Sequence, residues 1–86
     1  MADIVIYTKP TCPFCLKAKK LLQEKNLTFK EIDASGEKRE EMRQRANGRN
    51  TFPQIFINEK HIGGCDDLYN LENSGKLEEI LKSKNI

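Results

Sequence analysis

The 86-residue sequence has no tryptophan, one histidine and only three cysteines. Its longest uninterrupted apolar run is Ile4-Val5-Ile6-Tyr7, far shorter than the roughly 18 residues that a membrane span requires. The N-terminus also lacks the basic stretch followed by a longer apolar segment that is typical of a secretion signal. We therefore expect a soluble, cytoplasmic protein with no membrane partner.

Neither sign of charge dominates the sequence. Fifteen Lys and Arg residues against 13 Asp and Glu residues give a formal net charge of only +2, and the charges are dispersed along the chain. Nucleic-acid binding proteins usually carry a clustered basic patch, so we expect no nucleic-acid partner. The length suits one domain, residues 1–86, with room for a single small core, and we expect a monomer.

The hydrophobic pattern predicts alternating strands and helices. Strands are expected at residues 4–7, 27–32, 54–57 and 60–62. Helices are expected from 12 to about 25, over 37–46, from Asp66 to a break at Gly75, and around 77–81. Asn58-Glu59 separates the last two strands by the two residues of a hairpin turn. This order predicts an α/β fold in which helices cover both sides of a small mixed sheet.

The cysteines indicate redox or metal chemistry, because an odd number does not suit a disulfide scaffold and two of them form Cys12-Pro13-Phe14-Cys15. This motif follows the first strand and opens the first helix. Positions i and i+3 share a helix face, so a disulfide between Cys12 and Cys15 is sterically feasible. We predict Cys12 at an exposed helix cap as the attacking thiolate, with Cys15 one turn further in as the resolving thiol. The helix dipole, the N–H groups of Phe14 and Cys15, and the charge of Lys9 are expected to favour that thiolate.

Three separated motifs resemble small bacterial dithiol glutaredoxins over nearly the whole chain. They are Tyr7-Thr8-Lys9 leading into Cys12-Pro13-Phe14-Cys15, then Thr51-Phe52-Pro53, then Gly63-Gly64-Cys65-Asp66-Asp67-Leu68. The resemblance implies a thioredoxin-like fold, with a four-stranded mixed sheet in the order 2-1-3-4 flanked by helices. It also implies a glutathione-dependent thiol–disulfide oxidoreductase that reduces protein–glutathione mixed disulfides and protein disulfides.

The resemblance further implies a role for each site residue. Cys12 and Cys15 are the catalytic pair, Pro53 follows a cis peptide bond and faces them, and Phe52 pairs its backbone with glutathione. Lys9 attracts a glutathione carboxylate, and the segment from Gly64 holds the γ-glutamyl end. The implied glutathione-binding residues are Lys9, Phe14, Thr51, Phe52, Pro53, Gly64, Cys65, Asp66 and Asp67. Glutathione is the implied co-substrate, glutathionylated or disulfide-containing proteins are the implied partners, and no metal is expected.

Two positions depart from the family pattern. Phe14 stands where the family most often has Tyr, which removes a hydroxyl, and Phe52 stands where it most often has Val, which adds bulk.

Two metal-binding alternatives remain open. His61 and Cys65 are spaced His-x₃-Cys and would complete a Cys₃His zinc site with Cys12 and Cys15. The other alternative is a glutathione-ligated iron–sulfur carrier, which Pro13 disfavours because it stiffens the loop. We interpret His61 instead as a residue on the surface of its strand and the Cys65 sulfur as a spectator. A thioredoxin would carry Trp before a Cys-Gly-Pro-Cys motif, and this chain has no Trp.

Overall fold

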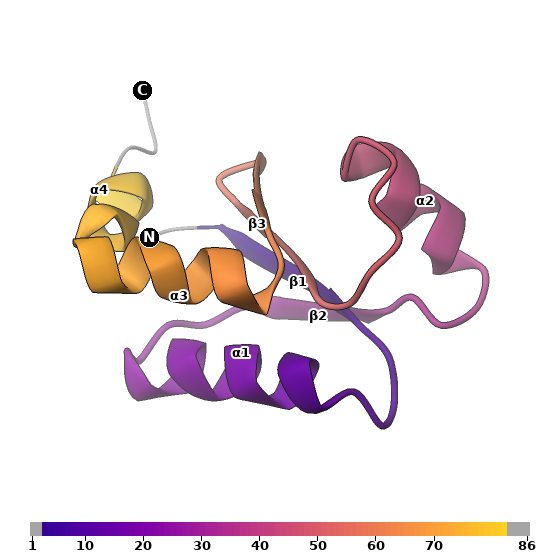
Figure 1. Cartoon of the computed structure of the whole chain (residues 1–86), viewed down its shortest axis with the longest axis horizontal. Helices are drawn as coiled ribbons and strands as arrows, with labels where there is room; N and C mark the ends of the chain where they lie inside the picture. Colours follow the sequence, from indigo (N-terminus) through magenta and orange to yellow (C-terminus); the bar gives the residue numbers. More distant parts are fainter. Residues whose placement is uncertain (1–2, 83–86) are drawn as a thin grey trace.

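The computed structural model describes residues 3–82, which form four strands and four helices (Figure 1). Within this range, none of the helices is both long enough and apolar enough to cross a membrane. The strands are β1 (Ile4–Thr8), β2 (Lys30–Asp33), β3 (Gln54–Ile57) and β4 (Lys60–Gly63). The helices are α1 (Pro13–Glu24), α2 (Lys38–Arg45), α3 (Cys65–Ser74) and α4 (Lys76–Lys82).

The strands form one mixed sheet in the order β2-β1-β3-β4. β1 is parallel to β2 and antiparallel to β3, and β3 is antiparallel to β4. Asn58 and Glu59 connect β3 to β4 with positive φ angles of 52° and 69°, which is the backbone of a tight two-residue hairpin turn. The predicted fold class, strand order and hairpin are confirmed.

The two faces of the sheet are covered by different helices, because successive side chains of a strand point to opposite sides. On one face, isoleucines of β1 and β3 form a core with residues of α1, α3 and α4. On the other face, Tyr7 and Phe56 pack with Met42 of α2 and Ala46 at its C-terminal cap. Figure 1 shows α2 set apart from the other three helices. The central strands are therefore buried on both sides, as the apolar run of β1 predicts.

β2 lies later in the chain than predicted. The sequence pattern placed it at residues 27–32, whereas pairing with Val5–Thr8 places it at Lys30–Asp33. Three of its four residues are exposed on the edge of the sheet, so its apolar pattern is too weak to define its ends. Leu27 and Phe29, which suggested the earlier start, contact the core from the connecting segment.

The helix boundaries agree with prediction to within about one residue. Cys12 is the N-cap of α1 rather than its first helical residue, and α3 begins at Cys65 rather than Asp66. Asn26, after α1, has the left-handed φ of 60° expected of a helix stop. Gly75 takes the same region with a φ of 80° and separates α3 from α4.

Candidate active site at two helix N-termini

The N-terminus of α1 carries the cysteine pair. Cys12 caps the helix, and its Sγ accepts a hydrogen bond of 3.1 Å from the Cys15 N–H. Pro13 follows in the first turn, where its missing N–H breaks no intrahelical bond. Both cysteines are free, but Cys12 is only 5% exposed, so the prediction of an exposed cap is wrong. The sulfur that accepts the Cys15 N–H therefore belongs to a largely covered residue.

The environment of Cys15 favours its protonated form. Burial, followed by a hydrogen bond to the Cys12 side chain, raises the pKa of Cys15 to about 12, although the backbone of Lys9 and the charge of Lys19 act in the opposite direction. At neutral pH Cys15 therefore keeps its proton. Cys12 thus receives hydrogen bonds from both the backbone and the side chain of Cys15. Hydrogen bonds donated to a sulfur stabilise negative charge that develops on it.

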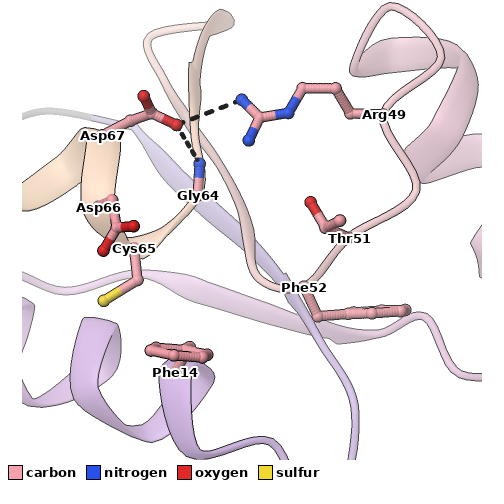
Figure 2. A pocket seen from close by; sticks show the side chains of 8 residues that line it. All are labelled: Phe14, Arg49, Thr51, Phe52, Gly64, Cys65, Asp66 and Asp67. Carbon is pink, nitrogen blue, oxygen red and sulfur yellow. Dashed lines mark hydrogen bonds and ion pairs between the residues drawn. The ribbon is translucent and has the colours of Figure 1, made fainter.

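A pocket opens between the N-termini of α1 and α3. Figure 2 shows the start of α3 on one side, the loop before β3 on the other, and Phe14 of α1 below them. Phe14 is 58% exposed, so its ring is available at the rim of the pocket. The lining residues are Phe14, Arg49, Thr51, Phe52, Gly64, Cys65, Asp66 and Asp67. Seven of these eight are predicted glutathione-binding residues.

Arg49 is the lining residue that the sequence analysis missed. It lies in the Asn47-Gly48-Arg49-Asn50 segment, whose only clear signal is a helix break. Its guanidinium reaches across the pocket, where Nη1 lies 3.2 Å from Asp67 Oδ2 (Figure 2). The only signal for Arg49 in the sequence is its positive charge two residues before Thr51.

Asp67 fixes the N-terminus of α3. Its Oδ2 accepts a hydrogen bond of 2.9 Å from the N–H of Gly64, the N-cap. That bond is the main reason why the pKa of Asp67 is lowered, and Arg49 adds to the effect. Gly63 has a φ of 120°, and a Cβ there would collide with the Asp67 carboxylate. A glycine before the cap is therefore required for this carboxylate to reach its partners.

Lys9 and Pro53 lie beside the pocket rather than in its lining. Lys9 lines a second pocket that also contains both active-site cysteines, and its Nζ lies 5.2 Å from the centre of the Phe52 ring. This distance suits a cation–π interaction. Pro53 is buried and follows the cis Phe52–Pro53 bond that the sequence analysis predicts. Its carbonyl oxygen faces Gly64, at 3.4 Å from the position that a Cβ would take.

The residues of the zinc alternative are not brought together. His61 Nε2 lies 2.7 Å from Gln54 Oε1, and its half-buried ring stacks at a tilt on Phe56, so His61 lies only partly on the surface of its strand. Within residues 3–82, no three His, Cys, Asp or Glu side chains form a group that could hold a metal ion. Burial raises the pKa of the Cys65 thiol, which therefore stays protonated at neutral pH.

Comparison with known proteins identifies the family of this chain. The family model described as Glutaredoxin matches residues 4–62. The chain belongs to the glutaredoxin family. It is 56% identical over 84 residues to Glutaredoxin 3 of Escherichia coli K12, a match that covers 95% of this chain and 100% of the relative. Glutaredoxins are thiol–disulfide oxidoreductases, and the predicted enzyme class is confirmed.

Solved structures of glutaredoxins share the fold. The solution structure of glutaredoxin from Brucella melitensis is 57% identical, with a TM-score of 0.84 and coverage of 100% of this chain and 95% of that one. A buckwheat glutaredoxin–glutathione complex is 30% identical, with a TM-score of 0.83 and coverage of 93% and 76% respectively.

Proposed function

We propose that residues 1–86 form a glutaredoxin domain that uses glutathione to reduce protein–glutathione mixed disulfides and protein disulfides. Cys12 is the nucleophile, and Cys15 is the resolving thiol. The observation that carries this assignment is the asymmetry of the pair: Cys15 donates to the Cys12 sulfur, while its own pKa is raised to about 12. We therefore assign the attack to the Cys12 sulfur, while Cys15 stays protonated until the resolving step.

The reduction of a mixed disulfide needs Cys12 alone. Its thiolate attacks the glutathione sulfur of the substrate, so a Cys12–glutathione disulfide forms and the target protein leaves as a thiolate. The thiolate of a second glutathione then attacks the bound glutathione sulfur. Oxidised glutathione leaves, and the Cys12 thiolate is regenerated. The net reaction converts one mixed disulfide and one glutathione into one protein thiol and one glutathione disulfide.

The reduction of a protein disulfide also needs Cys15. Attack by Cys12 leaves one target sulfur bound to Cys12 and releases the other as a thiolate. Cys12 is then part of a disulfide, so its share of the raised pKa of Cys15 is removed and only the share due to burial remains. The released target thiolate takes the Cys15 proton. Cys15 then attacks the Cys12 sulfur and releases the second target thiolate, which takes a proton from the solvent. Two glutathiones then reduce the Cys12–Cys15 disulfide.

The pocket matches the charges of glutathione, which carries two carboxylates and one ammonium group. The N-terminus of α3 presents N–H groups and a positive dipole end to one carboxylate. Arg49 and Lys9 supply positive charge for the other, and the exposed Asp66 carboxylate suits the ammonium group. The backbone of Thr51 and Phe52 suits pairing with an extended peptide, as in strand addition. The proposed glutathione-binding residues are Lys9, Phe14, Thr51, Phe52, Pro53, Gly64, Cys65, Asp66 and Asp67, to which we add Arg49.

A coupled assay with a glutathionylated peptide, glutathione, glutathione reductase and NADPH tests this function. We expect turnover that saturates with peptide and is lost in Cys12→Ser. The same peptide joined to a small thiol other than glutathione is the matched control, and it should react with a higher KM. Equal KM values for the two peptides would contradict a glutathione pocket.

Metal analysis distinguishes the proposed oxidoreductase from the alternative of a glutathione-ligated iron–sulfur carrier. Protein purified without chelators and without oxygen should contain iron well below one atom per two chains and show no charge-transfer absorption. Stoichiometric iron that depends on added glutathione would support the carrier function instead.

A further inference from the structure

β3 begins with a buried glutamine that bonds to Thr51, in the lining of the pocket, and to His61 of β4. Gln54 is 0% exposed and directly follows Pro53. Its Nε2 donates to both the carbonyl oxygen and the hydroxyl oxygen of Thr51, each at 3.0 Å. Its Oε1 lies 2.7 Å from His61 Nε2. A buried amide is costly unless it is hydrogen-bonded, so these bonds hold the side chain in one orientation.

The direction of the contact with His61 follows from counting donors. Both partners of Gln54 Nε2 belong to Thr51, so Oε1 is the atom left to accept, and His61 Nε2 carries the proton. Burial, followed by the charge of Arg49, lowers the pKa of His61, although Asp67 acts in the opposite direction. The ring is therefore neutral at pH 7, and its tautomer is the one protonated at Nε2.

His61 is itself held in place by the core on the face of the sheet that α2 covers. It stands opposite Phe56 in the β3–β4 pairing, and the centres of the two rings lie 5.0 Å apart. Phe56 also packs edge-on against Tyr7, at 5.6 Å, and carries the Arg45 guanidinium 4.5 Å from its centre. The imidazole is thus fixed by the sheet, whereas Thr51 is an exposed residue in the loop before β3.

We infer that Gln54 and His61 are positioning residues for glutathione recognition. His61 orients the Gln54 amide, and the amide fixes the carbonyl and hydroxyl of Thr51, which sets the Thr51–Phe52 backbone that lines the pocket. The inference rests on the proposed function, because it takes the ligand of that pocket to be glutathione. Neither side chain lines the pocket or bonds to the cysteine pair in any described contact. Their loss therefore affects the KM for a glutathionylated substrate more than kcat or the reactivity of Cys12.

A pair of substitutions at His61 separates the hydrogen bond from simple packing. His61→Leu removes the donor, and we expect it to raise the KM for a glutathionylated peptide about three- to tenfold, the effect of one lost hydrogen bond, with kcat little changed. His61→Gln retains an N–H donor and should recover most of the wild-type KM. Lys60→Ala, an exposed change on the same strand, is the control and should leave the KM unchanged.

Two further measurements test the inference independently of KM: the reactivity of Cys12 and the tautomer of His61. The rate of alkylation of Cys12 by iodoacetamide should be the same in wild type and His61→Leu. In wild-type protein at pH 7, nitrogen-15 NMR should show His61 as the Nε2–H tautomer, whether or not the variants fold. A wild-type KM in His61→Leu, an equal rise in His61→Leu and His61→Gln, or an Nδ1–H tautomer would each overturn the inference. Failure of the proposed function would look different, because wild-type protein would then lack turnover that depends on Cys12, while the tautomer would still report on the Gln54 contact.

Discussion

α1 and α3 both begin at the pocket, and each has a cysteine at its start, yet the two N-termini are built differently. At α1 the cap is Cys12 itself, whose sulfur receives the N–H of Cys15. At α3 the cap is Gly64, whose N–H donates to the carboxylate of Asp67 three residues later. Cys65 is then an ordinary first-turn residue. At α1 the N–H of Cys15 donates to a sulfur, and at α3 the N–H of Gly64 donates to a carboxylate of the same helix.

The comparison shows that a position at a helix N-terminus does not by itself make a cysteine reactive. The first turn of α1 contains no acidic residue, so its dipole acts on Cys12 without competition. The first turn of α3 carries Asp66 and Asp67. Burial and the nearby charge of Asp66 raise the pKa of Cys65, against the influence of Lys17. These differences support our proposal that the nucleophile is the cysteine whose sulfur is the cap.

The largest expected effect separates these two cysteines. Cys12→Ser should reduce deglutathionylation to the rate without enzyme, because serine is not ionised at neutral pH and cannot form the disulfide intermediate. Cys65→Ser changes only a protonated thiol and leaves the backbone N–H in place, so turnover should persist. The coupled glutathione reductase assay measures both variants. Loss of turnover in Cys65→Ser alone would reverse the assignment.

The next largest effect distinguishes protein disulfide reduction from deglutathionylation. Cys15→Ser should abolish reduction of an intramolecular protein disulfide, because no second sulfur can release the target from Cys12. It should retain deglutathionylation, since a second glutathione resolves that intermediate. Parallel assays with insulin disulfides and a glutathionylated peptide measure the split. Equal losses in the two assays would show that Cys15 acts mainly by stabilising the Cys12 thiolate.

A smaller effect is expected at the cap of α3. Asp67→Ala removes the acceptor for the Gly64 N–H and the partner of Arg49, and should lower the free energy of unfolding by about 0.5–1.5 kcal/mol. Asp66→Ala is the matched control, because it removes one negative charge from the same turn but leaves the bond to Gly64 intact. Urea denaturation measures both. Equal losses in the two variants would assign the effect to charge at the helix end rather than to the cap.

The smallest effect is the pH dependence of that cap. The pKa of Asp67 is lower in the folded chain than in the unfolded chain, chiefly because of the Gly64 N–H. Such a group stabilises the fold above its unfolded pKa, about 3.9, and loses this contribution as the pH falls through its folded pKa. The stability difference between wild type and Asp67→Ala should therefore be constant near neutral pH and shrink below about pH 3.9. A difference that stays constant in acid would show that the stabilising contribution of Asp67 does not depend on its negative charge.

Local sequence signals predicted most of the fold. The apolar run of β1, the helical spacing after Cys12 and the two-residue turn at Asn58-Glu59 each specify an element through short-range rules. The bounds of β2 were wrong because an exposed edge strand is defined by its partner. Strand order and the cis bond came from the family resemblance and not from the pattern of residues.

The site was predicted less completely than the fold, because its remaining features depend on contacts between distant segments. Arg49 reaches Asp67 across 18 positions of the chain, and no local pattern marks that pairing. The burial of Cys12 does not follow from its position at a helix cap in the sequence. The Gln54–His61 contact joins two strands across the hairpin, and the sequence alone favours a surface position for that histidine.

The identity of the first sulfur to react is the decisive observation. Reduced Cys15→Ser protein, which retains Cys12 and Cys65 in the same molecule, is mixed with one equivalent of glutathionylated peptide and quenched with acid within the first turnover. Peptide mapping by mass spectrometry then locates the transferred glutathione. A helix-cap thiolate predicts glutathione on Cys12 and an unmodified Cys65. Glutathione on Cys65, or divided equally between the two sulfurs, would contradict the assignment of the capping sulfur as the nucleophile.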